Sequence, residues 1–135
     1  MLNVKDIIQT INNLENMRFI KPASIEQIIE AEKELNVNFA DDYIKYVKKY
    51  GAISAKGIEL TGVTNYKRLS VAFITKKERN INPNIPANMY VIENTEIDGL
   101  IALQDETGKV YTITPNETPK LNCNSLSEYI EKSNF

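Results

Sequence analysis

The acidic residues between positions 93 and 106 are the side chains of this sequence that could most readily do chemistry. Glu93, Glu96 and Asp98 lie close together, and neighbouring carboxylates can bind magnesium or act as a general acid and a general base. Their spacing does not match the ligand spacing of an EF-hand loop, so we interpret the segment as a solvated loop. A small enzyme or metal-dependent hydrolase built on carboxylates and tyrosines stays open as an alternative.

Other catalytic chemistry is restricted by residue type. The chain has no histidine, which excludes mechanisms that use imidazole as a base, a proton shuttle or a metal ligand. Its one cysteine, Cys123, has no activating neighbour in the sequence, and we expect it to be buried or inert. The five glycines form neither a Walker phosphate loop nor a dinucleotide-binding fingerprint. The sequence therefore predicts a protein that is not an enzyme and needs no metal and no cofactor.

The composition limits the class of protein. With 42% hydrophobic and 25% charged residues, the 135-residue chain is expected to form a single domain, residues 1–135. The net charge of -2 and the isoelectric point near 5.3 argue against a protein that binds nucleic acid directly. The N-terminus lacks the apolar core of a signal peptide, and the apolar runs are too short to cross a bilayer. We therefore expect a cytoplasmic protein without a membrane partner.

Charges of opposite sign are segregated along the chain. The first acidic block contains Glu26, Glu30, Glu32, Glu34, Asp41 and Asp42, and a second acid-only stretch contains Glu93, Glu96, Asp98, Asp105 and Glu106. The charged residues between these blocks are mainly basic: Lys45, Lys48, Lys49, Lys56, Lys67, Arg68, Lys76, Lys77 and Arg79. A nearly neutral total can therefore conceal strongly polar faces, although most charge runs are solvated helix faces.

Tyrosines could serve either an interface or the core. Tyr43, Tyr46 and Tyr50 recur at helical spacing, and a tyrosine ring offers a large contact area with a polar tip. We expect these three rings to build the core between a helix and the sheet. Tyr66 lies in a polar segment and is the better candidate for an exposed position.

Four helices are expected to position these residues. An apolar stripe predicts the first helix over residues 3–15, with Asn3 as its N-cap. Ser24 and Gln27 form a capping box that opens the second helix, and Asn36 is its expected stop. The third helix begins at Asp41 or Asp42 and ends at Gly51, and the last runs near residues 125–133. These ends carry the capping residues and the charges that suit a helix dipole.

The middle of the chain has short apolar runs that are typical of strands. Apolar runs predict strands near residues 58–60, 71–74, 89–92, 100–103 and 110–113, and a polar segment with two prolines predicts a long surface loop over residues 75–88. Residues 105–108 end in Gly108 and predict a tight turn that pairs the strands on either side as antiparallel neighbours. The order of elements predicts an α+β fold with helices packed on one side of a mainly antiparallel sheet.

Several short motifs in this order resemble the SUKH superfamily. They are Ile28 with Glu32 and Leu35, then Phe39-Ala40-Asp41-Asp42-Tyr43, then Tyr50-Gly51 followed by Gly57-Ile58-Glu59-Leu60. The later matches are residues 88–92, 100–103, 108–111 and 125–130, so the resemblance covers roughly residues 24–130. It implies a SUKH-like fold for the whole domain.

The resemblance also implies a function. Members are most often intracellular immunity proteins that bind and neutralise a cognate toxin of a polymorphic or contact-dependent bacterial system, commonly a nuclease. The alternative is a non-enzymatic scaffold or regulator that binds an endogenous cellular protein, as the relatives similar to regulators of cell-wall synthesis do. An acidic surface could meet the cationic face of a nuclease. The candidate contact residues are Asp41, Asp42, Tyr66, Glu93, Glu96, Asp98, Asp105 and Glu106.

Overall fold

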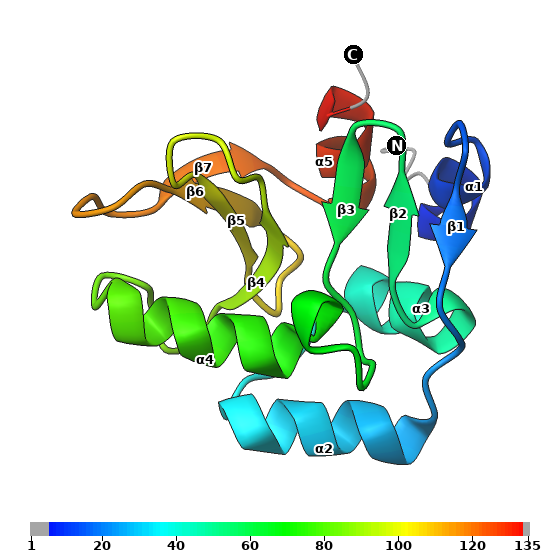
Figure 1. The fold of residues 1–135 in the computed structure, drawn as a ribbon, viewed down its shortest axis with the longest axis horizontal. Helices are drawn as coiled ribbons and strands as arrows, with labels where there is room; N and C mark the ends of the chain where they lie inside the picture. The colour runs from blue at the N-terminus through cyan, green and yellow to red at the C-terminus, as the bar shows by residue number, and fades with distance from the viewer. Residues whose placement is uncertain (1–5, 134–135) are drawn as a thin grey trace.

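The computed structural model of this chain describes residues 6–133, which form helices and strands in mixed order (Figure 1). The helices are α1 (Ile7–Asn12), α2 (Ile25–Leu35), α3 (Asp41–Tyr50), η1 (Lys67–Leu69), α4 (Val71–Ile81) and α5 (Leu126–Ser133). The strands are β1 (Arg18–Phe19), β2 (Ile53–Ala55), β3 (Ile58–Leu60), β4 (Tyr90–Asn94), β5 (Ile101–Gln104), β6 (Val110–Ile113) and β7 (Lys120–Cys123). No helix in this described part of the chain is both long enough and apolar enough to cross a membrane.

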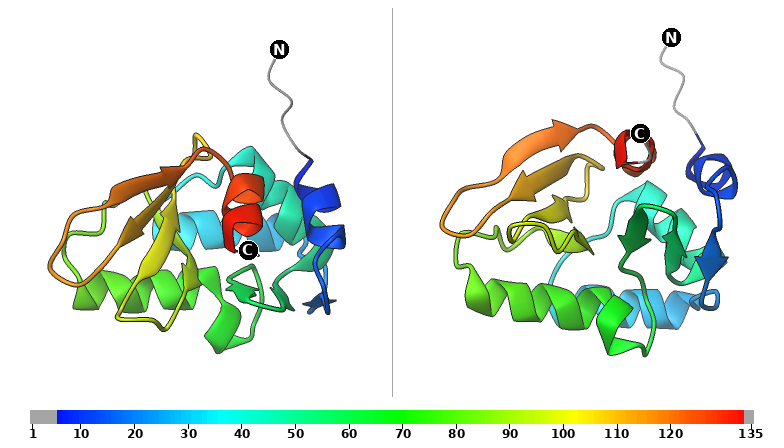
Figure 2. Two further views of the ribbon diagram at one scale, coloured as in Figure 1. Left: turned by 90° about the horizontal axis from the view of Figure 1, so that it is seen from above. Right: turned by 45° about the horizontal axis from the view of Figure 1, so that its top comes forward.

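The strands form two antiparallel sheets rather than one. The order of the first is β1-β2-β3 and that of the second is β4-β5-β6-β7. The sheets are linked just beyond β3, where the Thr61 N–H donates to the Ile92 carbonyl oxygen at 2.8 Å. Figure 2 shows the four-stranded sheet curving over α4, while Figure 1 shows α2 running beside α4. The α+β class is confirmed.

Aromatic side chains fill the core between α3 and the sheets. Tyr43 and Tyr46 are fully buried, which confirms that this face of the helix belongs to the core. The ring of Phe39 lies 4.8 Å from that of Tyr90 and 5.0 Å from that of Tyr43, measured between centroids. Such tilted and edge-to-face pairs add to the free energy gained by burial. The α3 helix is thereby fixed at the junction of the two sheets.

The segment that follows Ser70 corrects one prediction. Residues 71–74 are not a strand and residues 75–81 are not a loop, because both belong to α4. The Ser70 hydroxyl accepts a hydrogen bond from the Phe73 N–H at 3.2 Å and caps the helix. Thr75 is buried, and its hydroxyl oxygen accepts a hydrogen bond from the Val91 N–H at 2.9 Å. Packing against β4 therefore outweighs the local strand preference of the β-branched residues.

Other element boundaries follow the predictions more closely. Both halves of the Ser24 capping box are present, and Asn36 ends α2 in a left-handed conformation. The turn at residues 105–108 closes with Gly108 at φ +97° and joins β5 to β6 in antiparallel register. The first helix is shorter than predicted and is capped by Asp6, while the predicted cap Asn3 lies outside the described residues. Strands β2 and β7 were not predicted.

Candidate partner-binding surfaces

Asp42, one of the expected contact residues, is held by contacts within the fold. Its carboxylate accepts a hydrogen bond from the Leu126 N–H at 2.9 Å and another from the Gln104 side-chain amide at 3.0 Å. Gln104 is fully buried and also accepts a hydrogen bond from the Tyr90 hydroxyl at 2.8 Å. Desolvation by burial is the largest cause of the raised pKa of Asp42. The half-buried Asp42 therefore joins α3 to β5 and α5 through hydrogen bonds within the fold.

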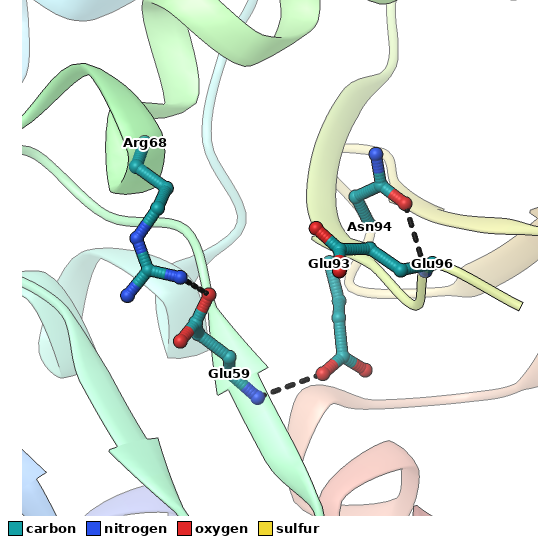
Figure 3. A network of polar contacts seen from close by, with 5 residues as sticks. All are labelled: Glu59, Arg68, Glu93, Asn94 and Glu96. Carbon is teal, nitrogen blue, oxygen red and sulfur yellow. Dashed lines mark hydrogen bonds and ion pairs between the residues drawn. The ribbon is translucent and has the colours of Figure 1, made fainter.

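Glu93 corrects the interpretation of its segment as a solvated loop, because it is buried and belongs to β4. One carboxylate oxygen accepts a hydrogen bond from the Glu59 N–H at 2.8 Å, and the other accepts one from the Tyr129 hydroxyl. Figure 3 shows Glu93 reaching β3, while the Glu59 side chain turns away and pairs with Arg68 at 2.9 Å. Glu93 thus ties β4 to β3 and α5. Glu93 therefore forms a structural contact between the two sheets.

The raised pKa of the Glu93 carboxyl leads us to expect that stability depends on pH. Its pKa lies above the usual value of 4.5, mainly because burial disfavours the charged form, although its two hydrogen bonds oppose this shift. The folded state therefore retains the proton at pH values where the unfolded chain has lost it. Proton binding by Glu93 therefore stabilises the folded state. This stabilisation is complete below pH 4.5 and is lost as the pH rises through the raised pKa.

The variant Glu93→Gln removes this titration while keeping the shape of the side chain. We expect its free energy of unfolding to fall less than that of the wild type as the pH rises above 4.5. Urea denaturation at several pH values measures the difference. The exposed Glu106 supplies the matched control Glu106→Gln. Parallel curves for the wild type and Glu93→Gln would contradict the assignment.

The remaining acidic candidates do not form one surface. Glu96 and Asp98 lie in the loop between β4 and β5, whereas Asp105 and Glu106 lie in the turn between β5 and β6. These connections are at opposite ends of β5 because β5 is antiparallel to both of its neighbours. Asp41 is exposed at the start of α3. Its neighbour Asp42 contacts Gln104, which lies at the end of β5 that leads into the turn toward β6. The structure therefore separates the acids into two groups.

The loop between β4 and β5 presents an apolar side chain between two carboxylates. Ile97 is 66% exposed, and its neighbours Glu96 and Asp98 are exposed and have φ values of +59° and +52°. The loop is closed by hydrogen bonds: the Thr95 hydroxyl donates to the Leu100 carbonyl oxygen at 2.7 Å, and the Leu100 N–H donates to the Ile97 carbonyl oxygen at 2.9 Å. Ile97 thus lies at the tip of a well-defined loop.

Tyr66 lies beside a hollow in another part of the surface. Its side chain is 64% exposed, as expected. The hollow has a volume of about 500 Å³ and lies between residues 20–22, Gln27 of α2 and residues 63–67. Sequence reasoning missed it because its two walls come from separate stretches of the chain, residues 20–27 and 63–67, and no local motif indicates that these stretches lie side by side.

The cysteine and the possible metal ligands are the other candidates for chemistry in the described residues. Cys123 is buried, as expected, and burial raises the pKa of its thiol. Its sulfur donates to the Ser125 carbonyl oxygen at 3.5 Å. Within residues 6–133, no group of three or more Cys, Asp or Glu side chains is arranged to hold a metal ion.

Comparisons with known proteins bear on the family. The search of curated proteins finds no match. A family model described as SMI1-KNR4 cell-wall matches residues 4–134, which is almost the whole chain. The match includes every helix and strand of the described structure, from α1 to α5. The resemblance to the SUKH superfamily is confirmed, and the chain belongs to the SUKH_5 family of SMI1-KNR4 cell-wall domains.

Proposed function

We propose that the protein is a cytoplasmic immunity protein that binds a cognate toxin and neutralises it without catalysis. Membership of the SMI1-KNR4 family supports a role in binding other proteins. The observation that carries the proposal is the exposed Ile97 between Glu96 and Asp98 at the tip of the β4–β5 loop. An apolar anchor with charged neighbours is the usual composition of an interface centre and its rim.

The chemistry of this loop indicates the kind of toxin. Two exposed carboxylates complement a cationic surface, and a nuclease has such a surface where it binds the phosphates of its substrate. If Ile97 packs on an apolar spot of the toxin, Glu96 and Asp98 lie on either side of it and can meet basic side chains around that spot. The protein would then block the substrate site by occupying it. Long-range attraction between the charges would speed the capture of the toxin.

Reversal of the loop charges is expected to slow this capture. The double variant Glu96→Lys/Asp98→Lys should reduce the association rate with the toxin domain encoded beside this gene by roughly tenfold or more at low salt. Stopped-flow mixing at two ionic strengths measures the rate. The matched control is Asp41→Lys/Glu106→Lys, because both acids are exposed and lie toward the opposite end of β5 from the loop. Equal slowing by both double variants would refute the assignment of the loop.

A second candidate function is a scaffold or regulator that binds an endogenous cellular protein. The description of the family as a cell-wall family favours it. The gene neighbourhood distinguishes the two functions, because an immunity protein is encoded beside a toxin and a scaffold need not be. Purification with a cellular protein, together with failure to bind the adjacent gene product, would favour the scaffold.

A further inference from the structure

The hollow beside Tyr66 has walls that the fold holds in place. On one side, the Ile20 N–H donates to the Ala52 carbonyl oxygen at 3.0 Å, and the Lys21 N–H donates to the Tyr50 carbonyl oxygen at 3.1 Å. On the other side, the Val63 N–H donates to the Gly51 carbonyl oxygen at 3.0 Å. Both walls are therefore attached to the segment between α3 and β2. A cavity formed in this way needs little reorganisation to bind a ligand.

The chemistry of the hollow is apolar with a cationic rim. Ile20 and Tyr66 contribute exposed apolar surface, with exposed fractions of 42% and 64%. Its two charged lining residues are Lys21 and Lys67, and neither belongs to an ion pair within the described part of the chain. Carboxylates are absent from the described lining of this hollow. The site therefore favours an apolar group that lies next to an anion.

The shape of the surface favours an extended chain over a compact ligand. A second hollow of about 430 Å³ continues along α2 and shares residues 63–65, Gln27 and Lys67 with the first. The second hollow reaches Phe73 of α4 and is also lined by Glu30, Glu34 and Lys76, of which Glu34 and Lys76 form an ion pair at 2.7 Å. Together the two hollows form a groove between α2 and the segment that leads into α4. A groove formed by two adjoining hollows can accept several residues of a peptide.

We propose that this groove binds a segment of a partner protein in which a large apolar side chain lies next to an aspartate or glutamate. The apolar side chain would occupy the hollow between Ile20 and Tyr66, and the carboxylate would meet Lys21 and Lys67. The cationic rim of the first hollow is opposite in charge to the β4–β5 loop. The groove is thus a second binding surface, and the inference does not require the partner to be a toxin.

Selection from a random peptide display library tests the proposal without knowledge of the natural partner. The wild-type protein should enrich peptides with a large apolar residue within about two positions of Asp or Glu, because both hollows accept an extended chain. An enriched peptide should bind at least tenfold more weakly to Lys21→Glu/Lys67→Glu and to Tyr66→Ala, as measured by fluorescence anisotropy. The same selection on Lys21→Glu/Lys67→Glu should enrich basic residues beside the apolar one.

The matched control is Lys48→Glu/Lys49→Glu, which makes the same change of net charge at exposed positions of α3. Thermal unfolding establishes that every variant folds. The proposal is overturned if no peptide is enriched, if the peptides lack acidic residues, or if the control weakens binding as much as the groove variant. These results would leave the β4–β5 loop and the proposed function untouched, since neither the groove nor a peptide enters the toxin-binding experiment.

Discussion

Replacement of Gly62 by alanine is expected to lower the free energy of unfolding by about 3 kcal/mol, the upper part of the range for overpacking a tightly packed site. A Cβ atom at Gly62 would lie 1.7 Å from the Gly51 carbonyl oxygen and 2.9 Å from the Ala52 Cα. Both are backbone atoms, so the clash can be relieved only by moving the chain. The movement would separate the segment after β3 from the end of α3.

Gly57 supplies the matched control for this prediction. It has φ +82°, and a Cβ atom there would meet its nearest neighbour at an ordinary distance of 3.8 Å. The variant Gly57→Ala should therefore cost only the backbone strain of a left-handed alanine, about 1 kcal/mol. Urea denaturation of both variants measures the two costs. Equal losses at the two positions would contradict the close backbone contact at Gly62.

The variant Tyr46→Phe is expected to lower the free energy of unfolding by about 3 kcal/mol, because it removes a hydroxyl that is hydrogen-bonded to two buried backbone groups. The Tyr46 hydroxyl donates to the Thr61 carbonyl oxygen at 2.8 Å and accepts a hydrogen bond from the Ile53 N–H at 3.0 Å. All atoms of the ring remain in the variant, so no large cavity forms. The lost stability would measure the two hydrogen bonds that connect α3 to the three-stranded sheet.

Tyr43 is the matched control, since it is equally buried and lies one turn earlier in α3. Within residues 6–133, its hydroxyl has one hydrogen-bond partner, the Thr61 hydroxyl, at 3.0 Å. The Thr61 hydroxyl also donates to the Val91 carbonyl oxygen at 2.7 Å. Loss of the Tyr43 hydroxyl therefore leaves Thr61 with a partner, and Tyr43→Phe should cost about 1 kcal/mol. A Tyr43→Phe loss as large as that of Tyr46→Phe would argue against this division of roles.

Local signals account for the helices that could be predicted from the sequence. The capping box at Ser24 and the apolar stripe of α2 act within a few residues, so their effect is visible without the fold. The α4 helix differs because residues 71–74 are β-branched or aromatic at three of four positions. Its helical state depends on packing against α2 and β4, which lie outside the segment that forms the helix. A single sequence does not reveal such contacts.

The candidate contact residues show the same limit. An acid-only stretch suggests a solvated surface, but the register of β4 against β5 shifts between Val91 and Glu93. Residues 91–93 are all buried, so the simple alternation of a strand does not apply at Glu93. Asp42 likewise looks like a local helix residue, yet its carboxylate binds Leu126, which is 84 positions away. Tyr66 was predictable because its neighbours in the sequence are polar.

Survival of cells that express the toxin domain encoded beside this gene is the most direct test of neutralisation by binding. Cells that also express the wild-type protein should grow, and purified wild-type protein should form a stable complex with that domain. Cells with Glu96→Lys/Asp98→Lys should lose this protection, while cells with Asp41→Lys/Glu106→Lys should keep it. Death of the cells despite abundant, folded wild-type protein, together with the absence of a complex, would contradict the account.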